Sequence, residues 1–267
     1  MDFRYLRHLA ESGTANIHPG GIGLTHLLIN SLNIKKSDMI LEIGCGTGET
    51  LVRIASQFDV KATGIDFLPE MLNASRKRIN FTGTNDKVTV IEHNINNPFP
   101  FESNSFDIIY LESALCFHDL PAVLNLLNES HRILKPGAVF AALETIWLSD
   151  VKREKANQIN SDAERDFGLR PSSNEVLHLE NWLGLFKKHG FEIISSFIAV
   201  PEKAEVRSLL NYRLFRSKLF TFNTKAKKIF DPVHLKEYLN YRKISKGQKP
   251  SGRTMETRLF LIKKKNQ

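Results

Sequence analysis

Residues 40–50, ILEIGCGTGET, place glycine at positions 44, 46 and 48 directly after an apolar run. Because glycine has no Cβ, such a turn can bend sharply and bring its N–H groups close to a ligand. A dinucleotide-binding turn carries glycine at its first, third and sixth positions, and the sixth position here is Glu49. A carboxylate at that place would repel a pyrophosphate, so the turn favours a nucleoside ligand that brings no phosphate.

Around this turn, runs rich in β-forming residues alternate with helical runs, which is typical of βαβ units and a parallel sheet. Strand-like runs cover 39–44, 60–66, 87–93, 106–112, 138–145, 191–200 and 255–265. Helical patterns cover 48–58, 68–79, 120–134 and 174–190, and Lys-Pro-Gly at 135–137 is expected to end the third of them. The pattern predicts an α/β fold with a Rossmann-like doubly wound sheet and helices on both faces.

The chain is expected to form a single domain of 267 residues around a core at 39–200. Residues 1–38 are expected to form an N-terminal cap. Residues 201–254 are too long for a structureless loop and predict a basic helical insertion, followed by a last strand and tail at 255–267.

The net charge of +8 is unevenly distributed. Residues 201–267 carry 18 Lys and Arg against 5 Asp and Glu, a local net charge of +13, whereas the rest of the chain carries −5. No secretory signal and no run of transmembrane length is visible, so the sequence predicts a soluble, cytoplasmic protein without a membrane span. Cys45 and Cys116 have no partner at metal-ligand spacing, and we expect neither a disulfide nor a metal site.

Asp66 ends the second strand-like run, 22 residues after Gly44. In doubly wound folds a carboxylate at this place binds ribose hydroxyls. The site therefore favours adenosine without phosphate, a description that S-adenosylmethionine meets.

With these residues the chain resembles the class I S-adenosylmethionine-dependent methyltransferases, whose first motif is an acidic residue followed by Gly-x-Gly-x-Gly. LEIGCGTGE at 41–49 matches that motif, and GIDFLPEML, HNINNPFPFESNSFDIIYLES and HRILKPGAVFAALE follow in the family's order. The similarity covers about residues 17–147 and extends to 175–200. It points to the small-molecule and quinone-biosynthesis branch, and it implies seven strands with the last one antiparallel.

The resemblance also implies cofactor contacts at the matching positions. Glu42 and the turn from Gly44 through Cys45 and Gly46 to Gly48 would hold the methionine end of S-adenosylmethionine. The product would be S-adenosylhomocysteine, and the family's reaction requires no metal ion.

The adenosine end is expected to lie further along the chain. Asp66 would bind the ribose, and Phe67 would lie beside the adenine. Where the family often has an acidic residue facing the adenine amino group, this chain has Asn94, followed by Ile95. Because the side-chain carbonyl of Asn94 can accept the same hydrogen bond, we expect an altered contact and an unchanged cofactor.

The absence of two known motifs argues against several classes of methyl acceptor. LESALCFHDL at 111–120 replaces the Asn/Asp-Pro-Pro-aromatic motif of enzymes that methylate adenine or glutamine, and Cys116 lacks the preceding proline of cytosine C5 enzymes. Glu112 and His118 in this segment are candidates for orienting the substrate or removing its proton. Each has a structural alternative, as a strand-end carboxylate and as a histidine at a helix entry.

Two further residues are candidate substrate contacts. His18, in HPGG, would reach the active site if the N-terminal segment folds over the cofactor, or it could simply form a turn. Trp147, just past the fifth strand-like run, could wall the acceptor pocket or pack in the core.

The basic segment 211–230 leaves two functions open. Tyr212, Phe215, Leu219 and Phe222 recur at helical spacing among basic residues, as in a helix that lays its aromatic side chains over a substrate pocket. The same pattern fits a helix that contacts a membrane surface, an RNA or an acidic protein. We therefore expect methyl transfer to a small organic acceptor, with a protein that acts on RNA or another macromolecule as the alternative. The oligomeric state cannot be read from the sequence.

Overall fold

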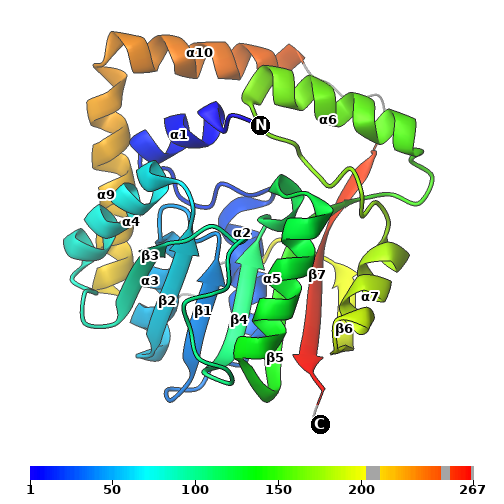
Figure 1. Ribbon diagram of the computed structural model, residues 1–267. Helices are drawn as coiled ribbons and strands as arrows, with labels where there is room; N and C mark the ends of the chain where they lie inside the picture. The colour runs from blue at the N-terminus through cyan, green and yellow to red at the C-terminus, as the bar shows by residue number, and fades with distance from the viewer. Residues whose placement is uncertain (203–210, 248–252, 266–267) are drawn as a thin grey trace.

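The centre of the molecule is a seven-stranded sheet with the strand order β3-β2-β1-β4-β5-β7-β6 (Figure 1). The computed structural model describes residues 1–202, 211–247 and 253–265 of the chain. Its strands are β1 (Met39–Ile43), β2 (Lys61–Asp66), β3 (Val88–Glu92), β4 (Phe106–Glu112), β5 (Leu134–Trp147), β6 (Phe191–Ile198) and β7 (Met255–Lys264). β7 runs antiparallel to both of its neighbours, and the pairs from β3 to β5 are parallel. The predicted fold class, with its antiparallel last strand, is confirmed.

The middle strands are apolar on both faces because helices cover both sides of the sheet. In β1, Ile40 lies in one core cluster and Leu41 in the other, and both are fully buried. α5 (Leu120–Ile133) and α7 (Leu179–Lys188) pack on the face of Leu41. α2 (Gly21–Ser31), α3 (Glu49–Phe58) and α4 (Pro69–Thr82) pack on the face of Ile40.

Helices also form a layer beyond the carboxyl ends of the parallel strands. α1 (Arg4–Glu11), α6 (Arg153–Phe167) and α10 (Pro232–Gly247) lie along the top of the view in Figure 1, above the arrowheads of β1, β2 and β4. These helices come from three distant parts of the chain. Together with the short 3-10 helix η1 (Leu115–Phe117), they surround the edge of the sheet at which parallel α/β folds bind ligands.

α9 (Tyr212–Ile229) packs outside α3 and α4 and leads to α10. Asn211 caps it by accepting hydrogen bonds from the N–H groups of Arg213 and Leu214. Leu214 and Ser217 face inward and are buried, whereas Tyr212 and Phe222 are 68% and 69% exposed. The aromatic side chains of the predicted stripe, Tyr212, Phe215 and Phe222, therefore face solvent rather than a substrate pocket.

Three element boundaries differ from the sequence expectation. β5 begins at Leu134, before Lys-Pro-Gly, because a register shift between Phe106 and Ile108 of β4 accommodates the extra residues. α7 begins only at Leu179, where His178 and Asn181 form a reciprocal cap. α6 occupies a polar segment in which no helix was predicted, and its Asn160 side chain donates to the carbonyl of Ser172.

No helix in the described parts of the chain combines the length and the apolar character needed to cross a bilayer.

Candidate functional site

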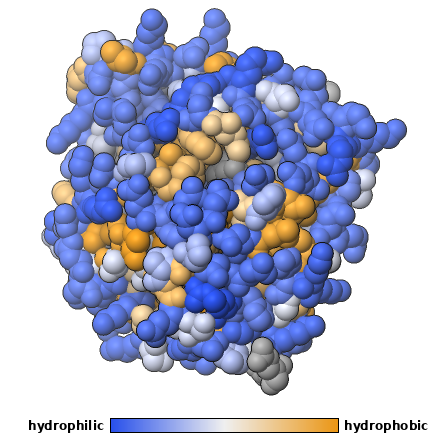
Figure 2. Space-filling model, viewed as in Figure 1, coloured by the Kyte–Doolittle hydropathy of each residue, from blue (hydrophilic) through white to orange (hydrophobic). Residues whose placement is uncertain are grey.

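A cavity of about 790 Å³ lies where the carboxyl ends of β1, β2 and β4 meet the helical layer above them. Its wall is mostly apolar, with side chains such as Leu6, Ile17, Ile43 and Met71. In Figure 2, apolar side chains gather around a hollow below α1 and α6. The cavity falls within the range of small-molecule sites, and we take it as the candidate active site.

The glycine turn forms the floor of this cavity through Gly44 and Gly46. The N–H of Gly44 donates to the carbonyl of Ile65 at 2.8 Å, which ties the turn to β2. Gly44 has a φ of +76°, and a Cβ there would lie 2.9 Å from the Cβ of Ala114. Both the backbone angle and the close approach of Ala114 require glycine at this position.

Asp66 lines the cavity at the end of β2 and braces the same turn. Its Oδ2 accepts from the N–H of Gly46 at 2.8 Å, and its Oδ1 accepts from the N–H of Leu68 at 2.9 Å. Burial raises the pKa of Asp66, and the backbone hydrogen bonds counteract part of that rise. Each carboxylate oxygen keeps a second lone pair, which leaves room for a ligand hydroxyl.

Phe67 and Ile95 also line the cavity, whereas Asn94 does not. The side chain of Asn94 is exposed, and its Oδ1 accepts from the N–H of Asn96 at 3.0 Å. Its neighbour His93 reaches the cavity wall in its place. The expected Asn94 contact with adenine therefore has no support in this geometry.

Glu42, Cys45 and Gly48 lie close to the turn but do not line the cavity. Glu42 is buried under it, where its Oε2 accepts from the hydroxyl of Tyr110 at 3.0 Å. Gly48 has a φ of +74° and begins α3 so close to α4 that a Cβ would collide with the side chain of Ser75. These residues shape the turn from behind.

His18 and Glu112 lie next to each other on the cavity wall, although His18 precedes the cofactor motifs in the chain and Glu112 follows them. The Nε2 of His18 lies 2.8 Å from Oε2 of Glu112, and the two side chains are only 6% and 5% exposed. The hydroxyl groups of Thr25 and Thr50 donate to the two oxygens of Glu112 at 2.8 and 2.7 Å. The Nδ1 of His18 lies 3.0 Å from the carbonyl of Pro19.

The environment of His18 favours its charged form. Burial alone would lower the pKa of His18, but the hydrogen bond to Glu112 and the charge of that carboxylate raise it above its ordinary value. With one ring nitrogen at Glu112 and the other at the carbonyl of Pro19, the imidazolium has an acceptor for each proton. The pair is a titratable group in contact with the cavity.

His118 lines another part of the cavity and is uncharged at neutral pH. Burial lowers its pKa to about 4, and the charge of Asp119 offsets only part of this effect. Its ring packs edge-on against Phe67, with 6.0 Å between the ring centroids. Asp119 itself caps α5 by accepting from the N–H of Ala122. His118 is therefore a wall residue next to the helix entry and a weak base.

Trp147 lies outside the cavity. Its ring is buried with Val151, Ala156 and Leu177, and its Nε1–H donates to the carbonyl of Ser173 at 2.7 Å. Trp147 thus packs in the core between β5 and α6, and it does not wall the acceptor pocket.

Several cavity residues escaped the sequence reasoning because they come from segments without a recognisable motif. They are Tyr5 and Leu6 of α1, Leu169 and Arg170 after α6, and Met255 and Glu256 of β7. Nothing in their local sequence marks them. Only the packing of α1, α6 and β7 over the strand ends brings them to the site.

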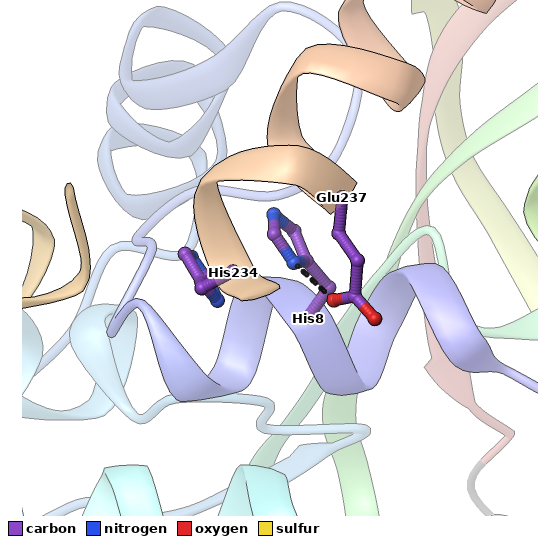
Figure 3. Close-up of side chains that lie close together, drawn as sticks. All are labelled: His8, His234 and Glu237. Carbon is purple, nitrogen blue, oxygen red and sulfur yellow. Dashed lines mark hydrogen bonds and ion pairs between the residues drawn. The ribbon is translucent and has the colours of Figure 1, made fainter. Parts of the chain in front are cut away.

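One His/Glu group among the described residues could share a metal ion, and it lies outside the cavity. His8 of α1 faces His234 and Glu237 of α10, and Figure 3 shows the three side chains. The two imidazole rings stack at 4.0 Å with 14° between their planes, and Nδ1 of His8 lies 3.2 Å from Oε2 of Glu237. Because ring lone pairs lie in the ring planes, stacked rings do not direct them to one point. The group therefore acts as a clamp between α1 and α10.

Comparison with known proteins finds methyltransferases among those similar to this chain. Residues 40–137 match a family model described as a methyltransferase domain. An uncharacterized methyltransferase of Bacillus subtilis is 28% identical over 203 residues, covering 76% of this chain and 80% of that protein. The 27-O-demethylrifamycin SV methyltransferase of Amycolatopsis mediterranei is 26% identical over 195 residues, covering 73% of this chain and 66% of that protein.

The fold has solved counterparts as well. The geranyl diphosphate C-methyltransferase of Streptomyces coelicolor, solved with S-adenosylhomocysteine, aligns with a TM-score of 0.60 and 14% identity. The alignment covers 90% of this chain and 78% of that structure. Together with the glycine turn and the carboxylate of Asp66 at one cavity, these similarities support a class I S-adenosylmethionine-dependent methyltransferase.

Proposed function

We propose that the enzyme methylates a small, largely apolar organic acceptor and releases S-adenosylhomocysteine. The observation that carries this proposal is the cavity of about 790 Å³ with its mostly apolar wall. Such a volume suits a nucleoside cofactor together with a small second molecule. Apolar walls favour an acceptor that gains by leaving water.

The residues at the turn fit the cofactor. Gly44 and Gly46 leave backbone open to the cavity, and Asp66 offers carboxylate lone pairs to ribose hydroxyls, next to the ring of Phe67. When bound, S-adenosylmethionine supplies an electrophilic methyl group on a sulfonium sulfur. The chain's own residues orient the two ligands and keep water away from them.

We assign proton removal from the acceptor to His18, with Glu112 as its partner. A nucleophile that carries a proton must lose it as it gains a methyl group, and a histidine in hydrogen-bond contact with a carboxylate is suited to accept it. In its neutral form, with Nε2–H donated to Glu112, His18 would take the proton on Nδ1, and Glu112 and the carbonyl of Pro19 would stabilise the resulting imidazolium. His118, with its lowered pKa, would contribute to the wall.

We propose that residues 1–38 form a cap over the site and that 201–254 form an insertion, of which residues 203–210 and 248–252 lie outside the described residues. Leu6, Ile17 and His18 in the cavity wall support the cap. None of residues 211–247 lines the cavity, so the second candidate, methylation of a macromolecule held by the basic region, has no supporting contact at the site. Both cysteines are free and buried, which fits the reducing cytoplasm that we propose as its compartment.

Calorimetry with S-adenosylmethionine and S-adenosylhomocysteine tests the cofactor site. The wild type should bind both, and Asp66→Asn should weaken each by about tenfold or more, since the amide NH₂ that replaces one carboxylate oxygen cannot accept from the backbone N–H group that it faces. Asp86→Asn, at an exposed carboxylate far from the turn, serves as the matched control and should bind as the wild type does. Absence of heat for both ligands with the folded wild type would refute the proposal.

Turnover is tested by counting S-adenosylhomocysteine released with a panel of phenols, quinols, amines and carboxylic acids of cavity size. We expect apolar members to react and highly charged ones to fail. His18→Gln should abolish turnover on acceptors that must lose a proton while leaving cofactor affinity within about twofold. If His18→Gln retains full turnover on such an acceptor, His18 is not the base.

A further inference from the structure

The outer surface of α9 and α10 exposes an unusual set of apolar side chains. On α9 they are spaced three, four or seven residues apart, so they form one stripe along the helix: Tyr212, Phe215, Leu219, Phe222 and Ile229. At the turn into α10, Phe230 is 86% exposed and Val233 is 69% exposed. The exposure continues on α10 with Tyr238 and Leu239.

This surface is held outward by contacts on the inner side of α9. The guanidinium of Arg78, itself fully buried, donates to the carbonyl and the hydroxyl of Ser217 at 3.1 and 2.9 Å. Near the other end of α9, Lys228 forms an ion pair with Glu11 of α1 at 3.0 Å. Because Leu214 and Ser217 occupy the inner side of α9, the apolar stripe lies on its outer side.

Basic side chains accompany the apolar stripe. Residues 211–247 contain ten Lys and Arg against two acidic residues, Asp231 and Glu237. Lys218 and Lys225 are exposed and border the stripe on α9, and Lys236 and Lys243 are exposed on α10. The surface thus combines apolar side chains with positive charge, which is the composition of helices that lie in a membrane interface.

The shape and charge of this surface favour one kind of binding partner over the others. A second copy would bring Lys218 and Lys225 against the same basic residues, which is unfavourable. RNA phosphates could contact the lysines, and bases could stack on the aromatic rings. The exposed aliphatic side chains of Leu219, Ile229 and Val233 would have no matching apolar group on RNA. A partner helix can follow the stripe of α9 but not the corner into α10, where the apolar exposure is highest (Figure 1). A fluid surface can accept both helices and the corner between them.

We propose that the α9–α10 corner docks the enzyme on an anionic membrane surface. The apolar side chains of the corner enter the boundary between headgroups and acyl chains, and the flanking lysines contact the negatively charged headgroups. α1 lies directly beneath α10, and Tyr241 of α10 packs against Tyr5 of the cavity wall with 4.9 Å between the ring centroids. Docking therefore brings the membrane next to the cap of the active site.

Vesicle flotation tests this assignment with the full chain in the absence of cofactor. We expect flotation with vesicles of phosphatidylcholine and phosphatidylserine, much weaker flotation with phosphatidylcholine alone, and a loss of binding as salt rises. Phe222→Ser combined with Phe230→Ser should weaken binding by about tenfold or more. Lys218→Gln combined with Lys225→Gln should weaken it about fivefold per lysine.

Matched controls carry the same changes elsewhere on the surface. Ile194→Ser, at an exposed position of β6, and Lys35→Gln combined with Lys61→Gln should bind vesicles as the wild type does. Calorimetry with S-adenosylhomocysteine checks that every variant keeps its fold and its cofactor site, so failure of docking and failure of the proposed function are separable. Undiminished flotation of the Phe222/Phe230 variant would overturn the proposal. So would absence of flotation at low salt, or RNA retention on filters without vesicle binding.

Discussion

At the scale of single residues, the charge state of His18 depends on one carboxylate, that of Glu112. It accepts hydrogen bonds from two threonine hydroxyls and from His18. Burial disfavours a charged imidazole, so without this carboxylate His18 would be a weaker base than it is in the wild type. Glu112 thereby tunes the group to which we assign proton removal.

Glu112→Gln should lower the pKa of His18. In the wild type the titration midpoint of His18 should lie above its ordinary value of about 6.5, and in the variant it should be lower, because burial is then opposed only by the carbonyl of Pro19 and the charge of Glu49. Proton NMR of the imidazole ring, assigned with His18→Gln, measures both midpoints. Equal midpoints in the two proteins would show that Glu112 does not set this pKa.

Glu144 is a second buried carboxylate, and it holds the segment after β4 in place. Its Oε1 accepts from the N–H groups of Ala114 and Leu115 at 2.8 and 2.9 Å, while its Oε2 has no partner among the described residues. Burial raises the pKa of Glu144 to about 7. A carboxyl whose pKa is raised on folding destabilises the native state as pH rises from its unfolded pKa towards its folded one.

Glu144→Gln should therefore stabilise the protein at pH 8 and change little at pH 5. The amide oxygen can still accept from both N–H groups, and removing the charge should raise the free energy of unfolding at pH 8 by up to about 3 kcal/mol. Glu144→Ala leaves both N–H groups without an acceptor and should lower it by about 2–3 kcal/mol at either pH. Urea unfolding measures both. If the Gln variant is less stable than the wild type at pH 8, the predicted stabilisation is wrong.

At the scale of elements, one arginine joins four segments. Arg78 of α4 donates to the carbonyl of Gly13 after α1, to the carbonyl of Thr47 in the glycine turn, and to Ser217 and Thr221 of α9. Burial lowers its pKa to about 10, so it remains charged at neutral pH. The basic insertion is thus coupled to the cofactor turn through a single buried side chain.

Arg78→Met should lower the free energy of unfolding by about 3 kcal/mol or more, because three carbonyl oxygens lose a charged donor. The matched control is Arg216→Met on α9. Arg216 lies over the ring of Phe81 at 4.9 Å, and its loss should lower stability by less than about 1 kcal/mol. Urea unfolding compares the two. Losses of similar size would mean that Arg78 does not anchor α9.

Sequence patterns predicted the elements best where local chemistry decides them. Pro69 opens α4 as predicted, whereas Gly83, with a φ of +69°, ends it beyond the predicted end at residue 79. α6 was missed because only Ala156 and Asn160 of that helix are buried, too few to produce a helical period. Its position depends on contacts with the loop before α7, which lie outside any local window.

At the scale of the whole molecule, the cavity is closed by segments distant in sequence. α1 supplies Tyr5 and Leu6, the segment after α6 supplies Leu169, and β7 supplies Met255. α1 is in turn clamped to α10 by the stacked rings of His8 and His234 (Figure 3). Ligand binding in the cavity should therefore stabilise α1, although α1 is far from the glycine turn along the chain.

Hydrogen exchange tests this coupling. Saturating S-adenosylhomocysteine should slow exchange of the α1 amides by about tenfold or more, because openings that break the cavity become rarer in proportion to ligand occupancy. α7 packs on the sheet away from the cavity, so the exchange of its amides through local openings should slow by less than about twofold. Equal protection of the two helices would show that α1 is not part of the binding unit.

The sequence by itself determined the sheet, the glycine turn and the cofactor class, because strand period, glycine spacing and the place of Asp66 are local patterns with local physical causes. It also brought forward Glu112 and His18 as separate candidates. Only the tertiary structure decided that they form one pair, that Trp147 belongs to the core and that Asn94 faces solvent. It likewise turned the aromatic stripe of α9 outward. These outcomes depend on which segments pack together, and that is set by the total burial of apolar surface, which no short stretch of sequence contains.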